Sequence, residues 1–332
     1  MALSWIYSRI TGLRNGLYER DWLEVSDLGA RTISVGNITT GGTGKTPLVA
    51  HAARVLLGRG EKVCILTRGY KREDPSQRVL VSDGEQILAD ARSAGDEPLE
   101  LAQKLSGRAV IIADADRGEA GKWANRKFGT TAFILDDGFQ HRQVSRNVDI
   151  VCIDATDPWG GGKTLPSGRL REPPDGLGRA DIVVITRADL VHHLEELRSE
   201  ISRLNATAPV FTCINKIAAV RPLKDDQAMP GEAAKNARAF AFCAIGNPES
   251  FFEQLRREGF DLAGSQTYRD HHSYTQKDIG ELERDAAKAG AGALLTTAKD
   301  AVKLTELDIQ LPCFVVEIET VIDDAEAFEA LI

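Results

Sequence analysis

One stretch near the N-terminus constrains the fold more than any other. The strand-like run Thr32 to Asn37 (TISVGN) leads into the glycine-rich loop Thr39 to Thr46 (TTGGTGKT), and the helix-forming sequence PLVAHAARVLL follows. Glycines let backbone N–H groups turn toward a phosphate, and the N-terminus of the following helix adds positive potential. This order of strand, loop and helix predicts a nucleotide-binding P-loop at the carboxyl edge of a parallel sheet.

The loop residues are expected to bind ATP and its magnesium ion. Lys45 is expected to reach the β and γ phosphates, and the hydroxyl of Thr46 to ligate Mg²⁺. Thr39 stands where the strict pattern has glycine, so a glycine-rich turn without nucleotide is the alternative. The residues assigned to the nucleotide are Thr39, Thr40, Gly41, Gly42, Thr43, Gly44, Lys45 and Thr46.

A second glycine-rich run, Gly160 to Thr164 (GGGKT), resembles the first only superficially. Asp157 occupies the position of the first glycine, and Leu165-Pro166 does not open a helix. We interpret this run as a flexible loop over the active site rather than as a second nucleotide loop.

The fold class predicted is α/β, a P-loop NTPase-type, mostly parallel sheet with helices on both faces. From residue 31 onward, short apolar runs alternate with helix-length amphipathic stretches, which is typical of parallel strands joined by crossover helices. The strands expected in this sheet are Thr32 to Val35, Val63 to Leu66, Ala109 to Ile112, Ala132 to Leu135, Ile150 to Ile153 and Ile182 to Ile185.

A second, smaller α/β domain is expected toward the C-terminus, since 332 residues fit two domains. We assign residues 1–28 to an amphipathic N-terminal helix, 29–208 to the kinase core, 209–237 to a boundary and 238–332 to the smaller domain. Val210 to Val220 is expected to form a pair of connecting strands. The later strands are expected at Phe240 to Ile245, Ala293 to Thr296 and Phe314 to Ile318, with helices from Glu249 and Thr275.

Charge and cysteine usage exclude some classes of protein. A net charge of -8 and a pI near 5.4 argue against nucleic-acid binding, which needs a dense positive face. The five cysteines form no C-x-x-C pair or zinc spacing and lie in or beside apolar runs. They are expected to be reduced core thiols of a cytosolic protein, and the N-terminus lacks the pattern of a signal peptide.

The first twenty residues have two interpretations. Apolar residues recur at helical spacing and arginines follow, which suits a helix lying in an anionic membrane interface. A helix packed on its own domain is the alternative. The apolar positions are Leu3, Ile6, Ile10, Leu13 and Leu17.

Two carboxylates follow a predicted buried strand. Asp136 and Asp137 come directly after Ala132 to Leu135. P-loop enzymes use carboxylates at strand ends to hold Mg²⁺ opposite the phosphate loop. Because adjacent carboxylates repel each other unless a cation is near, we assign both residues to the metal and Asp137 also to catalysis with Lys45.

Several further motifs give the chain a specific resemblance. They are GGTGKT, LTRGYKR at 66–72, AGDEP at 94–98, DDGFQHR at 136–142, LPSGRLREP at 165–173, DHH at 270–272 and TTAKDAVKL at 296–304. Together, and in this order, they resemble the tetraacyldisaccharide 4'-kinases. The landmarks span almost all of the chain, and DDGFQHR with LREP is far more specific than a P-loop alone.

This resemblance implies a reaction and a location. The γ-phosphoryl group of ATP would pass to the 4'-hydroxyl of a tetraacylated, 1-phosphorylated glucosamine disaccharide, giving lipid IVA in lipid A biosynthesis. The family acts at the cytoplasmic face of the inner membrane, which favours the interfacial interpretation of residues 1 to 20. Neither nucleic acid nor an obligate protein partner is implied.

The resemblance also assigns roles to two residues that their local sequence leaves open. Asp96 matches the family's proposed base for the acceptor hydroxyl, and His271 matches the histidine that supports it. Asp96 is otherwise an ordinary helix N-cap and His271 an ordinary surface histidine. Because the two residues fall in different domains, we expect domain closure to bring them together over the acceptor.

Four more residues lie in family motifs where contacts with anions and substrate are expected. The planar guanidinium of arginine suits phosphate, so these residues are assigned to the acceptor's 1-phosphate or to the transferring group. Ordinary surface arginines are the alternative. The residues are Arg68, Arg117, Arg171 and Glu172.

Three other functions were compared with this one. A switch ATPase would need lysine at position 40, which is Thr40, and a GTPase would need N-K-x-D where Thr186 to Asp189 reads T-R-A-D. A kinase of small metabolites would need no membrane-facing helix. A membrane adaptor without enzymatic activity would have no use for Lys45 opposite Asp136 and Asp137.

Overall fold

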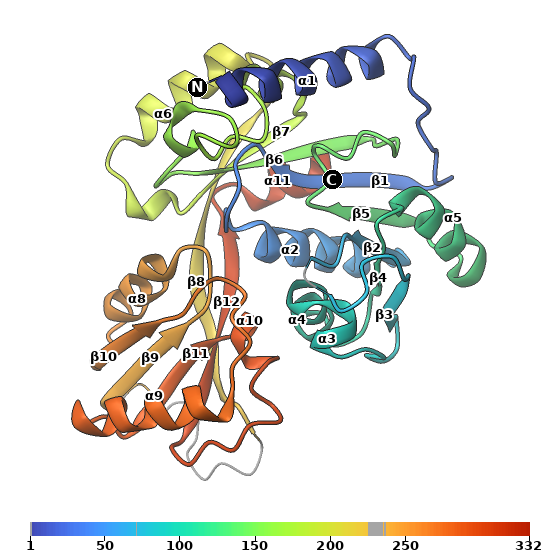
Figure 1. Ribbon diagram of the computed structural model, residues 1–332. Coiled ribbons are helices and arrows are strands. Elements are labelled where there is room, and N and C mark those ends of the chain that lie inside the picture. The colour runs from blue at the N-terminus through green and yellow to red at the C-terminus, as the bar shows by residue number, and fades with distance from the viewer. Residues whose placement is uncertain (1, 71, 225–234, 236) are drawn as a thin grey trace. The chain divides into compact units, whose positions relative to one another are not determined.

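The computed structural model describes residues 2–70, 72–224, 235 and 237–332, and it divides into two compact units (Figure 1). The first unit comprises Met1–Asn215 and Thr320–Ile332, and the second comprises Lys216–Glu319. The last residues of the chain therefore group with the first unit, whereas the sequence pattern placed all of 238–332 in the smaller domain.

The first unit is built on a sheet of the order β8-β7-β6-β1-β5-β2-β4-β3. Its strands pair in parallel except β3, which runs antiparallel to β4 at the edge. All six strands predicted for this sheet are confirmed, and β3 was not predicted. The bounds are β1 Arg31–Asn37, β2 Val63–Thr67, β3 Val79–Asp83, β4 Val110–Ala113, β5 Ala132–Asp136, β6 Val148–Asp154, β7 Ile182–Thr186 and β8 Val210–Pro222.

Helices cover both faces of this sheet, as predicted. On one face, Leu48 of α2, Leu101 of α4 and Phe328 of α11 share a core with inward residues of the strands. On the other face, α5 and α6 close two further apolar clusters. The helices are α1 Ala2–Glu19, α2 Lys45–Gly58, α3 Ala91–Ala94, α4 Asp96–Lys104, α5 Arg117–Phe128, α6 Leu194–Leu204 and α11 Ala325–Leu331, with 3₁₀ turns η1 Gly160–Gly162, η2 Pro174–Arg179 and η3 Ala188–Leu190.

The second unit has the strand order β10-β9-β11-β12-β8. Two apolar clusters, one with α8 and one with α9, lie on its strands. The three predicted strands and both predicted helices are confirmed, and Thr275 caps α9 through a capping box. The bounds are β9 Ala239–Cys243, β10 Leu262–Thr267, β11 Ala293–Thr297, β12 Cys313–Ile322, α8 Pro248–Arg257, α9 Gln276–Lys288 and α10 Ala298–Ala301.

One expectation about the connection was wrong. Val210 to Val220 forms no pair of strands but lies within the single strand β8, which runs for 13 residues. The stretch contains no glycine or proline that would turn the chain before Pro222, so the strand continues. Of the polar excursion expected at Arg221 to Arg238, residues 225–234 and 236 lie outside the described residues.

All five cysteines are free and buried, as expected of core thiols. Burial raises the pKa of Cys152 and of Cys243 to about 12, so these thiols stay protonated at neutral pH. None of the helices described is long and apolar enough to cross a membrane.

The C-terminal helix α11 is an integral part of the first unit. The ring of Phe328 is fully buried and meets Phe211 edge to face, with the centroids 5.5 Å apart. Arg59 at the end of α2 donates a hydrogen bond to the carbonyl of Glu329 over 2.6 Å. The helix therefore closes the core over α2 and β8.

We expect Phe328→Ala to lower the free energy of unfolding by about 3–5 kcal/mol, because it leaves a cavity in a packed core. Chemical denaturation followed by circular dichroism would measure this loss. Leu331→Ala is the control, since Leu331 lies on the same helix and is 41% exposed. Equal effects of the two substitutions would contradict the assignment of α11 to the core.

Candidate active site

The glycine-rich loop joins β1 to α2, as its sequence predicted. Gly44 caps α2 with φ +77°, and Gly41 has φ +110°. Both values lie where L side chains are strained, so the glycines are needed to turn the loop. A Cβ on Gly41 would also lie 2.5 Å from Nη2 of Arg169.

Side chains at the ends of β1 and β7, which lie on either side of β6, hold this loop. The amide of Asn37 donates to Oγ1 of Thr43 over 2.7 Å, and Oγ1 of Thr186 donates to the Thr43 carbonyl over 3.0 Å. Arg187 donates to the carbonyl of Gly42 over 2.6 Å and forms an ion pair with Asp154. Thr186 and Arg187 stand where a GTPase would carry its guanine signature, but here they support the phosphate loop from the end of the buried strand β7.

The second glycine-rich run lies against the phosphate loop. The Thr40 N–H donates to the Arg169 carbonyl over 2.7 Å, and the guanidinium of Arg169 donates to the Thr40 carbonyl over 2.8 Å. Arg169 also forms an ion pair with Asp157 over 2.8 Å. The segment around η1 therefore borders the nucleotide loop rather than forming another one.

The carboxylate of Asp137 is the centre of the site. Its Oδ1 lies 3.3 Å from Nζ of Lys45, and its Oδ2 accepts a hydrogen bond of 2.6 Å from Arg171. Burial alone would raise the pKa of Asp137, but the positive charges of Lys45, Arg171 and Arg117 lower this pKa well below its usual range. Asp137 is therefore charged. Lys45 lies beside it, as expected, and Arg171, which was assigned to the substrate, contacts it as well.

Asp136 is in a different environment from its neighbour. It is the last residue of β5, is buried, and accepts a hydrogen bond from Oγ1 of Thr67 over 3.1 Å. Burial raises the pKa of Asp136 to about 6, and the charges of Glu97 and Asp137 add to the effect. Thr67 was not predicted, but it ends β2 beside β5, where strand-end side chains meet.

Two of the predicted arginines lie on this edge of the sheet. Arg117 opens α5, is buried, and donates to the Asp137 carbonyl over 3.2 Å. Burial lowers the pKa of Arg117, and the charges of Asp137 and Asp136 counteract this. Arg68 directly follows β2 and is exposed. Arg117 thus supports Asp137, while Arg68 is open to a ligand.

Glu172 lies inside the protein, with a side chain close to fully buried. Its Oε1 accepts from the amide of Gln140 over 2.9 Å, and its Oε2 accepts from Arg179 over 2.8 Å and from Asn15 over 3.2 Å. Glu172 is 1% exposed, so its carboxylate is occupied by these three side chains. None of these three partners was predicted: Asn15 and Gln140 come from segments distant in sequence, and Arg179 is brought back to Glu172 by the turn η2.

Asp96 is the first residue of α4, where a carboxylate is favoured by the helix dipole. It is buried, and Gly95 before it has φ +89°. A Cβ on Gly95 would lie 2.9 Å from the carbonyl of Tyr70, so the AGDEP turn packs closely against the LTRGYKR loop.

His271 belongs to the second unit and lies in a left-handed backbone conformation, with φ +62°. Its N–H donates to the carbonyl of Ala244 over 3.2 Å. Nζ of Lys299 lies 3.4 Å from its Nε2 and forms an ion pair of 3.1 Å with Asp270. Lys299 comes from the TTAKDAVKL motif, to which the sequence analysis gave no role.

The residues at the loop fit a magnesium ion that is shared with phosphate. Oδ1 of Asp137 is buried and, beside its ion pair with Lys45, accepts no hydrogen bond from the described residues. Across the described chain, no three His, Cys, Asp or Glu side chains gather into a metal cage. Mg²⁺ is usually bound by one or two carboxylates together with substrate phosphates, which the hydroxyl of Thr46 and the two aspartates allow.

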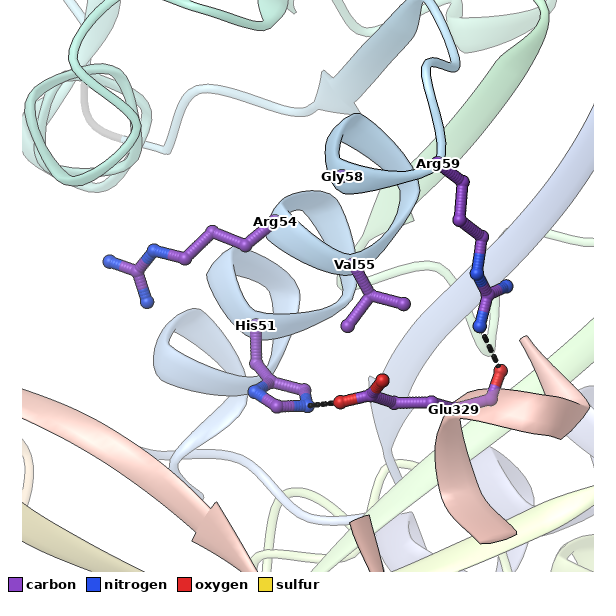
Figure 2. A pocket seen from close by; sticks show the side chains of 6 residues that line it. All are labelled: His51, Arg54, Val55, Gly58, Arg59 and Glu329. Atoms are coloured by element: carbon purple, nitrogen blue, oxygen red, sulfur yellow. Dashed lines mark hydrogen bonds and ion pairs between the residues drawn. The ribbon is translucent and has the colours of Figure 1, made fainter. Parts of the chain in front are cut away.

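A pocket of about 470 Å³ lies elsewhere, along the second half of α2. Figure 2 shows His51 and Arg59 directed toward Glu329 of α11; the nearest atoms of His51 and Glu329 are 3.7 Å apart. The pocket is formed by residues that are not part of the phosphate loop. It is lined by His51, Arg54, Val55, Gly58, Arg59 and Glu329.

Comparisons with known proteins agree over the whole chain. The family model described as tetraacyldisaccharide-1-P 4'-kinase matches residues 1–332. The tetraacyldisaccharide 4'-kinase of Geobacter metallireducens is 39% identical over 303 residues, which is 91% of this chain and 87% of that protein. The enzyme of the same name from Geobacter sulfurreducens is 39% identical over 90% of this chain and 82% of its own. A crystal structure of LpxK from Aquifex aeolicus in complex with ATP superimposes with a TM-score of 0.79 at 29% identity, covering 99% of this chain and 96% of that one.

Proposed function

This chain belongs to the tetraacyldisaccharide-1-P 4'-kinase family, and we propose that it transfers the γ-phosphoryl group of ATP to the 4'-hydroxyl of tetraacyldisaccharide 1-phosphate in lipid A biosynthesis. The observation that carries the proposal is the pairing of Lys45 with Asp137 at 3.3 Å, beside the glycine-rich loop. A lysine and a carboxylate placed in this way are the parts that phosphoryl transfer from Mg-ATP needs.

The loop residues hold the nucleotide in this proposal. Backbone N–H groups between Thr39 and Thr46 bind the phosphates, and Lys45 neutralises charge on the β and γ groups. Thr46, Asp136 and Asp137 would hold Mg²⁺, which would screen the negative charge of the phosphates. Arg187 and Asn37 stabilise the conformation of the loop through their hydrogen bonds to Gly42 and Thr43.

The arginines supply positive charge for the anionic groups of the two substrates. Arg171 and Arg117 already contact Asp137, so they set the orientation of that carboxylate and add positive potential where phosphate binds. Arg68 is exposed and is proposed to contact the acceptor's phosphate or the transferring group.

Asp96 and His271 are proposed to prepare the acceptor. Asp96 takes the proton of the 4'-hydroxyl, and His271 raises the basicity of Asp96 or receives the proton in turn. The conformation of His271 is stabilised by the Ala244 carbonyl and by Lys299, which fixes where the imidazole points. Asp96 opens α4 beside the LTRGYKR loop, which contains Arg68.

Helix α1 is proposed to lie on the cytoplasmic face of the inner membrane. Its polar residues face the protein: Ser8 donates to Oγ1 of Thr164 over 2.9 Å, and Thr164 donates to the Ser4 carbonyl over 3.0 Å. Most of its large apolar residues instead face outward, the reverse of a helix packed on a core, whereas Leu17 is half-buried and Tyr18 is buried. The exposed fractions are Leu3 66%, Trp5 62%, Ile10 62% and Leu13 67%.

An outward apolar face with arginines beside it suits an anionic lipid surface. The guanidinium of Arg9 lies 5.1 Å from the ring centre of Trp5, so charge and aromatic surface are adjacent. In this proposal, α1 brings an acidic protein to the membrane that contains the acceptor. The four acyl chains of the acceptor stay in the bilayer while its sugar reaches the site.

Transfer of labelled γ-phosphate to tetraacyldisaccharide 1-phosphate in detergent micelles tests the reaction. Wild-type protein is expected to form product, and Lys45→Ala to lower the turnover about 100-fold or more because charge stabilisation at the phosphates is lost. Lys62→Ala is the control, since Lys62 is exposed and lies outside the site. Absence of product with folded, ATP-binding wild type would refute the proposed acceptor.

Asp96→Ala and His271→Ala are each expected to lower kcat by about 10²–10⁴ while leaving ATP affinity unchanged, since general-base help has this size. The double variant should cost about as much as one single variant, because residues that act as a unit are not additive. Steady-state kinetics and binding of a fluorescent ATP analogue measure both effects. His192→Ala, at an exposed histidine, is the control. Near-wild-type turnover of both single variants would remove this mechanism.

Replacing Leu3, Ile10 and Leu13 with serine is expected to weaken binding to anionic phospholipid vesicles at least about tenfold. Burying one leucine side chain contributes about 1.5 kcal/mol or more, and a free-energy change of this size alone changes a binding constant about tenfold. Co-sedimentation measures binding, and ATP affinity should not change. The matched control replaces three exposed apolar residues elsewhere, Ile87, Leu88 and Leu331. If both triple variants sediment alike, α1 is not the membrane contact.

A further inference from the structure

We infer that Glu172 is a positioning residue that connects helix α1 to the carboxylate of Asp137 through a continuous chain of hydrogen bonds. The contact of Asn15 with Glu172 thereby contributes to the orientation of the carboxylate that faces the loop lysine. This inference rests on the proposed function, because it gives the membrane-facing helix an influence on the phosphate site.

The chain can be followed atom by atom. Nδ2 of Asn15 donates to Oε2 of Glu172 over 3.2 Å, and Nε2 of Gln140 donates to Oε1 of Glu172 over 2.9 Å. Nη1 of Arg171 donates to Oε1 of Gln140 over 3.3 Å and to Oδ2 of Asp137 over 2.6 Å. Glu172 and Gln140 each use different atoms for their two links, whereas Nη1 of Arg171 donates to both of its partners.

Glu172 is built into this place as a charged group. It is 1% exposed, and a buried carboxylate is costly unless it is paired. Arg179 pairs with it over 2.8 Å and lies 4.5 Å from the ring centre of Phe139. A Cβ on Gly176 would lie 2.4 Å from Oε2 of Glu172, so the turn leaves room for this carboxylate and for nothing larger.

The middle of the chain is fixed to the phosphate loop. Nε2 of Gln140 also donates to the carbonyl of Asn37 over 2.8 Å, and the N–H of Arg171 donates to the carbonyl of Ile38 over 2.8 Å. A change in Gln140 or Arg171 therefore alters the hydrogen bonds at the end of β1, where the loop begins, as well as those at Asp137.

The other end of the chain is fixed to α1 by more than one bond. Arg14 donates to the carbonyl of Gln140, and Arg142 donates to the carbonyl of Asn15 over 2.9 Å. This part of α1 and the DDGFQHR segment thus contact each other through side chains from both sides. A shift of α1 along the protein is transmitted to Gln140 and from there to Arg171.

The experiment compares two substitutions on α1. Asn15→Ala removes the hydrogen bond to Glu172. The control Ser8→Ala removes the hydrogen bond between Ser8 and Thr164, which also holds α1 but is not part of the series of hydrogen bonds that leads to Asp137. Full-length proteins are assayed with acceptor in anionic vesicles, and binding of a fluorescent ATP analogue is measured with and without Mg²⁺. We expect Asn15→Ala to lower kcat several-fold at unchanged KM for the acceptor and to reduce the gain in ATP-analogue affinity that Mg²⁺ gives. Ser8→Ala should leave both values at the wild-type level.

Glu172→Gln is the stronger variant. It should lower kcat about 10- to 100-fold, the range found when groups that orient metal ligands are changed, and abolish most of the Mg²⁺-dependent gain in ATP-analogue affinity. Thermal denaturation shows whether Glu172→Gln is folded. If this variant does not fold, Asn15→Ala still tests the series of hydrogen bonds.

Equal kcat and equal Mg²⁺-dependent binding in Asn15→Ala and Ser8→Ala would overturn the inference. So would a Glu172→Gln variant that is folded and fully active. If the wild type itself transfers no phosphate to the acceptor, the proposed function fails, but the comparison of ATP-analogue binding still decides whether Glu172 positions Asp137.

Discussion

The attraction between the Asp137 carboxylate and the cations of Lys45 and Arg171 is the interaction on which the site depends. Strands β1 and β5 are neighbours in the sheet, so the start of α2 and the end of β5 meet although they are far apart in sequence. Asp137 has φ +52°, a conformation that costs about 1–3 kcal/mol in a residue with a side chain. Three cations around one carboxylate offset that strain, which explains why the turn persists.

Two adjacent aspartates take on different properties because of their surroundings. Asp137 faces cations and its pKa is lowered, whereas burial raises the pKa of Asp136 to about 6 beside Glu97. Without a further cation the pair carries less than two negative charges near neutral pH. A bound divalent cation favours the charged form of both, so metal binding and deprotonation of Asp136 support each other.

Local sequence was sufficient for six strands of the main sheet and for the pairing of Lys45 with Asp137. Continuous apolar runs mark strands buried on both faces, and strand ends of a parallel sheet meet at one edge. β3 and β10 escaped prediction because edge strands lack such a run: β10 reads LAGSQT. Asn15 and Gln140 reach Glu172 from segments far apart in sequence, and only the folded chain brings them to one carboxylate.

Helical spacing showed that α1 is amphipathic but not which side faces the protein. Its polar side does, through Ser8 and Asn15, so hydrogen bonds rather than apolar burial hold much of the helix in place. Each such bond contributes about 0.5–1.5 kcal/mol, less than the burial of one leucine. The lipid contact proposed for the outward apolar residues would act on this helix. Asn15 is the attachment through which the inferred chain of hydrogen bonds leads from the helix to Asp137.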